Sequence, residues 1–132
     1  MRSGDLIKRK VRLYKSTTAE MSRRGIGAEF VRHVVSSRIT GEYLPRRGIG
    51  PFTLQVITPV DVGLYSRTLH FAEDLGTNRE LAFFREDLET IWPHLTKDDR
   101  GRPMFSQFVR AILWEYLESM KRVREVRHAR NR

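Results

Sequence analysis

The feature that most restricts the fold of this chain is an apolar stripe with helical spacing near its C-terminal end. Phe105, Phe108, Ile112 and Tyr116 recur three or four residues apart, and the stripe continues for about five helical turns. Shorter stripes with the same spacing predict further helices over residues 6–15, 26–39, 59–75 and 78–92. Because amphipathic helices joined by short connections bury their stripes against one another, the pattern predicts an all-α fold, a small helical bundle.

Glycine, proline and capping residues mark the expected ends of these helices. Gly41 follows the second stripe, Thr58 and Pro59 form a helix start, and residues 77–80 have the form of a capping box. The stretch between Gly41 and Pro59 lacks helical spacing, and its short extended run has no obvious partner strand. The predicted division is a basic, kinked N-terminal helical arm at 1–41, an irregular Gly- and Pro-containing crossover at 42–58, and a helical bundle with a basic C-terminal tail at 59–132.

Positive charge is segregated along the chain, which has a net charge of +9. Residues 1–50 hold 12 cations against 4 acids, residues 51–120 hold 7 against 11, and residues 121–132 hold 6 against 1. Twenty of the 25 cations are arginine, which binds phosphate in a bidentate manner and is less strongly hydrated than lysine. Such a distribution indicates that the basic segments meet a polyanion, and nucleic acid fits the arginine bias best.

The pentapeptide Arg-Arg-Gly-Ile-Gly occurs twice, at residues 23–27 and 46–50. Paired guanidinium groups donate to phosphate oxygens in a forked geometry, and glycine lets backbone N–H groups approach the same anion. The alternative is two ordinary Gly-rich turns with solvated arginines. We expect the cationic segments to contact nucleic-acid phosphates, and the candidate binding residues are Lys8, Arg9, Lys10, Arg12, Lys15, Arg23, Arg24, Arg32, Arg38, Arg46, Arg47, Arg122, Arg124, Arg127 and Arg130.

Residues 71–82 have a second interpretation, as a helix-turn-helix motif. The turn glycine, Gly76, and the residues before it fall at that motif's relative positions, and a recognition helix from Asn78 would present Arg79 and Arg85 to the major groove. The acidic residues of the same helix oppose this interpretation, since duplex DNA carries one phosphate charge about every 1.7 Å. A transcriptional regulator of this kind and an RNA- or ribosome-associated protein are therefore alternatives to sequence-independent DNA binding.

Residues with catalytic or metal-binding chemistry are few and scattered. The chain has no cysteine, its four histidines show no metal-ligand spacing, and it contains neither a phosphate-binding loop nor a nucleophile elbow. We therefore expect no enzymatic activity, no cofactor, no metal and no small-molecule substrate. No apolar run approaches the roughly 20 residues of a membrane-spanning helix, so any membrane contact is expected to be indirect.

The layout of the chain resembles that of the major capsid proteins of filamentous and rod-shaped archaeal viruses. The resemblance covers the basic segment from Asp5 to Ile39, with its Arg-Arg-Gly-Ile-Gly kink, and the helices from Pro59 to about Val126. It implies that the basic arm wraps double-stranded DNA while the bundle packs the filament, by self-association or with a related second coat subunit. On this basis we expect a structural DNA-packaging protein located in the virion; the alternative location is the cytoplasm, in association with nucleic acid.

Overall fold

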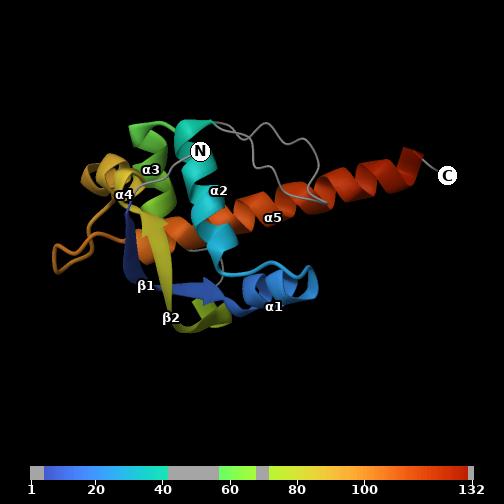
Figure 1. Cartoon of the computed structure of the whole chain (residues 1–132), viewed down its shortest axis with the longest axis horizontal. Coiled ribbons are helices and arrows are strands. Elements are labelled where there is room, and N and C mark those ends of the chain that lie inside the picture. Colours follow the sequence, from blue (N-terminus) through green and yellow to red (C-terminus); the bar gives the residue numbers. More distant parts are fainter. Residues whose placement is uncertain (1–4, 42–56, 68–71, 131–132) are drawn as a thin grey trace.

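The computed structural model describes residues 5–41, 57–67 and 72–130, with residues 120–130 described as helical backbone only. Two strands and several helices follow one another along the chain (Figure 1). In chain order they are β1 (Leu6–Tyr14), α1 (Lys15–Arg23), α2 (Glu29–Thr40), α3 (Pro59–Arg67), the 3₁₀ turn η1 (Ala72–Asp74), β2 (Leu75–Phe84), α4 (Arg85–Ile91), the 3₁₀ turn η2 (Trp92–His94) and α5 (Phe105–Arg130).

The expectation of an all-α bundle is wrong, because β1 and β2 form a two-stranded antiparallel sheet and the fold is mixed α/β. β1 occupies the place of the first predicted helix. Val11 and Leu13 on one face of this strand are buried, whereas Lys10 and Arg12 on the other are exposed. In so short a run, apolar residues can satisfy helical spacing and strand alternation equally well. The pairing of β1 with a strand about 70 residues away therefore decides its structure.

β2 also removes the helix-turn-helix interpretation. Residues 75–84 are extended and pair with β1, so no recognition helix begins at Asn78. The next helix starts at Arg85 instead. Leu81 and Phe83 alternate with more exposed neighbours, and the strand buries both of them against the helices while its backbone completes the ladder.

The basic N-terminal segment belongs to the folded body and is not a separate arm. α1 begins directly after β1, and the chain turns at Gly25, whose φ of 67° lies in the left-handed region, before α2 starts at Glu29. Phe30 and Val34 of α2 are completely buried. The first Arg-Arg-Gly-Ile-Gly sequence thus interrupts the helical structure as expected, whereas the second lies outside the described residues.

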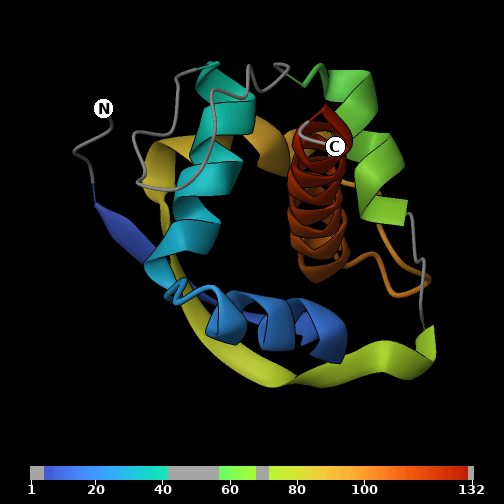
Figure 2. The ribbon, with the colours of Figure 1, turned by 90° about the vertical axis from the view of Figure 1, so that its right-hand side faces the viewer.

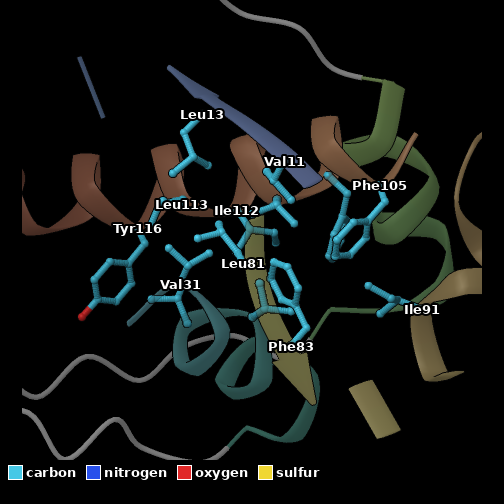
Figure 3. Packing of buried hydrophobic residues seen from close by; sticks show 14 of the residues in the cluster. Val11, Leu13, Val31, Leu81, Phe83, Ile91, Phe105, Ile112, Leu113 and Tyr116 are labelled. Atoms are coloured by element: carbon cyan, nitrogen blue, oxygen red, sulfur yellow. The ribbon is translucent and has the colours of Figure 1, made fainter. Parts of the chain in front are cut away.

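The core forms around α5, which runs through the middle of the fold with the other elements arranged around it (Figures 1 and 2). Phe108, Val109 and Ile112 of this helix have no exposed surface. The ribbon formed by β1 and β2 contributes its inner face to the same core (Figure 3). Phe83 of β2 meets Phe105 of α5 edge to face, with ring centroids 5.0 Å apart. The ribbon is therefore fixed to the helices on one side only.

The fold contains two successive strand–helix–helix units. The first unit is β1, α1 and α2, and the second is β2, α4 and α5. The units are interleaved, because α2 packs on β2 and α5 packs on β1. α3 packs against α5. Each strand of the ribbon is therefore packed against a helix of the other unit.

Two of the helices predicted from the sequence, α2 and α5, are confirmed in position, and the predicted start of α3 is also correct, although α3 ends at Arg67 and residue 75 begins β2. α2 ends before Gly41, and α5 begins at Phe105. α3 begins at Pro59 after a capping box: the Thr58 hydroxyl accepts a hydrogen bond from the Asp61 N–H at 3.2 Å, and the Asp61 carboxylate accepts one from the Thr58 N–H at 2.8 Å. In these places local capping chemistry agrees with the tertiary structure.

Replacing Gly41 by alanine should lower the free energy of unfolding by about 1–2 kcal/mol, because a side chain at a left-handed position is strained. Gly41 has a φ of 77°, and its N–H donates to the Ser37 carbonyl at 2.8 Å. The measurement is urea denaturation. Gly63→Ala is the control: Gly63 lies inside α3 without a positive φ, and an added Cβ would be 3.4 Å from the nearest atom, so this variant should be neutral or slightly more stable. Equal effects of the two substitutions would contradict the prediction.

Candidate nucleic-acid interface

The outward face of the β1–β2 ribbon carries two rows of side chains that do not take part in the core. Because successive residues of a strand point to opposite faces, Val11, Leu13, Leu81 and Phe83 pack on the helices, and the residues that alternate with them point outward. Ladder partners on this outer ribbon face are Lys8 with Ala82, Lys10 with Glu80, and Arg12 with Asn78. Ala82 is half-buried and the other residues are exposed.

Charge on the outer ribbon face is unevenly divided between the strands. β1 contributes three cations, Lys8, Lys10 and Arg12, whereas β2 contributes one acid, Glu80, and two neutral residues. Lys8 Nζ lies 3.7 Å from a carboxylate oxygen of Glu80, and their side chains remain 74% and 56% exposed. Such an exposed pair is weak, so both groups remain available to a ligand.

Hydrogen bonds of Arg12 hold this end of the ribbon against the start of α5 and join its two strands. The Arg12 N–H donates to Ser106 Oγ at 2.8 Å, and Arg12 Nε donates to the Gly76 carbonyl at 2.8 Å. Arg110 lies beneath this end: its Nη1 donates to the Arg12 carbonyl at 2.8 Å and to Ser106 Oγ at 3.1 Å. Burial lowers the pKa of Arg110 from the usual arginine value, yet a guanidinium keeps its charge at neutral pH. The acceptors of these two hydrogen bonds are uncharged, so they do not neutralise the positive charge of Arg110 beneath the ribbon.

The structure brings together some of the predicted binding residues and separates others. Lys8, Lys10 and Arg12 share the outer ribbon face. Arg9 belongs to the other face, where its guanidinium lies over the Trp92 ring at 5.2 Å. Lys15 is exposed at the start of α1, next to the ribbon.

The paired arginines of the first Arg-Arg-Gly-Ile-Gly sequence bind a carboxylate of the same chain. Arg24 Nε donates to Glu20 Oε1 at 2.7 Å, and Arg23 pairs with Glu20 Oε2. Glu20 is almost fully buried, whereas the Arg23 side chain is 69% exposed. This turn is therefore closed by its own salt bridges, an arrangement that favours the ordinary structural interpretation of the pentapeptide.

Arg38 joins three helices and faces the interior. Its Nη1 donates to Glu115 Oε1 at 2.8 Å, its Nη2 donates to the Tyr65 hydroxyl at 3.0 Å, and that hydroxyl donates to Glu115 Oε2 at 2.6 Å. Burial and the neighbouring carboxylate raise the pKa of Tyr65, so the phenol keeps its proton. Arg38, with 6% of its surface exposed, is a structural link between α2, α3 and α5.

The remaining predicted residues take no part in the outer ribbon face. Arg32 is half-buried in α2. Arg46 and Arg47 lie outside the described residues. Arg122, Arg124, Arg127 and Arg130 belong to α5, and their side chains lie outside the described part of the structure.

Three residues of the outer ribbon face were missed by the sequence interpretation, namely Asn78, Glu80 and Ala82. A signal for them exists in the alternation of residues 78–83, where Leu81 and Phe83 are buried and the residues between them are more exposed. The capping-box pattern of residues 77–80 obscured this alternation.

Replacing Glu20 by glutamine should weaken the dependence of stability on acid pH. The hydrogen bond from Arg24, together with the charges of Arg23 and Arg24, holds the pKa of Glu20 below its usual value of 4.5. A lowered folded-state pKa stabilises the fold above the usual pKa, and this contribution is lost as the pH falls through the folded-state value. Thermal unfolding between about pH 6 and pH 3 should show a smaller loss for Glu20→Gln than for the wild type. Parallel losses in the two proteins would contradict the pairing.

Other kinds of site receive little support within the described ranges. No group of three or more potential metal ligands is found there. An open depression of about 300 Å³ beside the ribbon contains no catalytic grouping; it is lined by Ile7, Arg9, Arg85, Leu88, Glu89 and Trp92. Among the described helices, none combines the length and apolar character that crossing a bilayer requires.

Comparison with protein-family models, with curated proteins and with solved structures finds no match to this chain.

Proposed function

We propose that the protein binds double-stranded DNA by placing the β1–β2 ribbon in the major groove, with the outer ribbon face toward the base edges. One observation carries this proposal: a two-stranded antiparallel ribbon, attached to the core by its inner face, presents two rows of mostly long, polar or charged side chains. The major groove is wide enough to admit such a ribbon, and proteins that read DNA with strands use it in this way.

The side chains of the outer ribbon face have the chemistry that base recognition requires. Lys10 and Arg12 can donate to guanine O6 and N7, Asn78 can form two hydrogen bonds with adenine, and Glu80 can accept from the cytosine amino group. A surface used only for phosphate neutralisation has no need of Asn78 or Glu80. The proposed activity is therefore sequence-selective DNA binding, the biochemical activity of a transcriptional regulator.

Cations beside the ribbon supply the phosphate contacts that position a protein on duplex DNA. Lys15 follows β1, Arg85 follows β2, and Arg79 is an exposed residue of β2 itself. The buried charge of Arg110 adds positive potential at the Arg12 end of the ribbon. In this proposal the basic N-terminal residues bind DNA, as expected from the sequence, but they do so from a β-ribbon and not from a helical arm.

Two earlier hypotheses make different predictions from this one. The filament-coat hypothesis remains untested, and it requires coating of long DNA without regard to sequence. Its expected helical arm is replaced by β1, α1 and α2, which belong to the folded body. An RNA-binding role fits the ribbon poorly, because the major groove of an RNA duplex is deep and too narrow for side chains to read.

Methylation interference tests the proposed groove directly. Duplexes selected by the protein from a random pool are treated with dimethyl sulfate, which methylates guanine N7 in the major groove and adenine N3 in the minor groove. We expect N7-methylated guanines to be depleted from the bound fraction at a few neighbouring positions, because guanine N7 is an acceptor for Lys10 and Arg12. N3-methylated adenines should bind normally.

A duplex RNA of the same sequence is the matched competitor, and it should compete poorly at physiological salt. Interference confined to adenine N3 would place the protein in the minor groove and contradict the proposal. Equal binding of duplex RNA, or equal binding of all DNA sequences, would also contradict it.

A further inference from the structure

We propose that a single chain reads a non-palindromic DNA site. The backbones of the two strands of its ribbon are related by a local two-fold axis, but the strands carry different side chains. This inference rests on the proposed function and adds the kind of target sequence and the number of chains bound to it.

The local two-fold axis follows from the pairing of the strands. The central ladder pair of the outer ribbon face is Lys10 with Glu80. Rotation about an axis through this pair exchanges the flanking pairs, so that Lys8 takes the place of Asn78 and Arg12 takes the place of Ala82. Residues related in this way lie 70 positions apart in the chain.

Burial and backbone geometry obey the same relation beyond the central pairs. Three pairs of residues that are 70 positions apart are buried in both units: Val11 and Leu81, Leu13 and Phe83, and Met21 and Ile91. The residues that precede α1 and α4 are also equivalent. Tyr14 has φ −67° and ψ 144°, and Phe84 has φ −68° and ψ 131°. The interleaved packing of α2 on β2 and α5 on β1 continues the symmetry into the helices.

Every equivalent pair on the outer ribbon face differs in chemistry. Lys8 corresponds to asparagine, Lys10 to glutamate, and Arg12 to alanine. A symmetric protein dimer binds a palindrome because both halves present the same side chains to the two half-sites. Here β1 offers three donors suited to guanine. β2 offers groups suited to adenine, to cytosine and to the methyl group of thymine.

The complete ribbon also lies within one chain. Both strands, and both helices that follow each strand, belong to the same polypeptide. No second copy is needed to build the outer ribbon face. We therefore expect one chain per minimal duplex, an asymmetric consensus, and guanines at the half contacted by β1.

The test is selection of bound sequences from a random duplex pool, combined with native mass spectrometry of the shortest duplex that binds. The wild type should select an asymmetric motif and give a complex of one chain with one duplex. A symmetrised variant, Asn78→Lys, Glu80→Lys and Ala82→Arg, should select an inverted repeat, because its two strands present the same chemistry. Its thermal unfolding is measured alongside, since like charges placed opposite one another in a ladder are unfavourable.

A second, milder variant keeps the test valid if the symmetrised protein folds poorly. Glu80→Gln should bind DNA, and it should lose roughly tenfold of the preference for one cytosine-containing base pair while the rest of the motif is unchanged. A palindromic wild-type motif, or two chains on the minimal duplex, would overturn the inference and leave DNA binding intact. Absence of duplex binding by the wild type would overturn the proposed function, and this inference with it.

Discussion

Replacing Lys8, Lys10 and Arg12 together by alanine should reduce the affinity for duplex DNA by about 100-fold or more, while the protein remains folded. In the proposed complex each side chain contacts a base edge or a phosphate, and losses of about 1 kcal/mol each correspond to about a factor of 100 in total. The three side chains lie on the outer ribbon face and contribute little to the core. The temperature of unfolding should therefore change by only about 5 °C or less. Fluorescence anisotropy with a labelled duplex, at several salt concentrations, measures the effect.

A charge-matched pair of single variants separates a local contact from the effect of net charge. Lys10→Ala and Arg67→Ala each remove one positive charge. Arg67 is an exposed residue at the end of α3, which lies across α5 from β1 (Figure 2). Lys10→Ala should weaken binding of the selected duplex and lower the preference for guanine at one position of the site, whereas Arg67→Ala should change neither much. Equal effects of the two variants would show that binding depends on overall charge and not on the ribbon.

Replacing Phe83 by alanine should cost about 3–5 kcal/mol of unfolding free energy, the largest effect on stability that we predict. The Phe83 ring has no exposed surface, and it packs edge to face on Phe105, with centroids 5.0 Å apart (Figure 3). Its removal leaves a cavity between the ribbon and α5, so the loss combines lost burial with lost packing. Urea denaturation followed by circular dichroism measures the change.

Leu64→Ala is the control for Phe83→Ala, because Leu64 is 48% exposed on α3. This substitution should cost less than about 1 kcal/mol. A loss below about 1 kcal/mol for Phe83→Ala as well would mean that the ribbon is not packed on α5 as described.

The sequence predicted α5 and α2 well, because each carries a sustained apolar stripe and clear end signals. Phe105 begins the long stripe of α5, and Gly41 ends α2. Thr58 and Asp61 placed the start of α3 correctly for the same kind of reason, since a capping box acts within four residues. Local chemistry decides such features before any distant contact forms.

The candidate site was predicted only in part. Lys8, Lys10 and Arg12 stand out in the sequence as cations, and they do share a surface. Arg38 has the same local appearance, yet it is buried against Glu115, which lies 77 residues further along the chain. Sequence charge alone does not separate a cation that faces solvent from one that neutralises a distant carboxylate. Asn78 belongs to the site because of its ladder partner, Arg12, which is also far away in the chain.

The sequence by itself determined where the chain is basic, which helices have strong apolar stripes, and where those helices end, because these properties depend on residues within a few positions of one another. The tertiary structure alone decided that residues 6–14 and 75–84 are strands, since a strand is stabilised by backbone hydrogen bonds to a partner segment that can lie far away in the chain. It also decided which cations face outward. Pairing of two distant segments turned a run of charges, expected to line a helix, into one face of a ribbon.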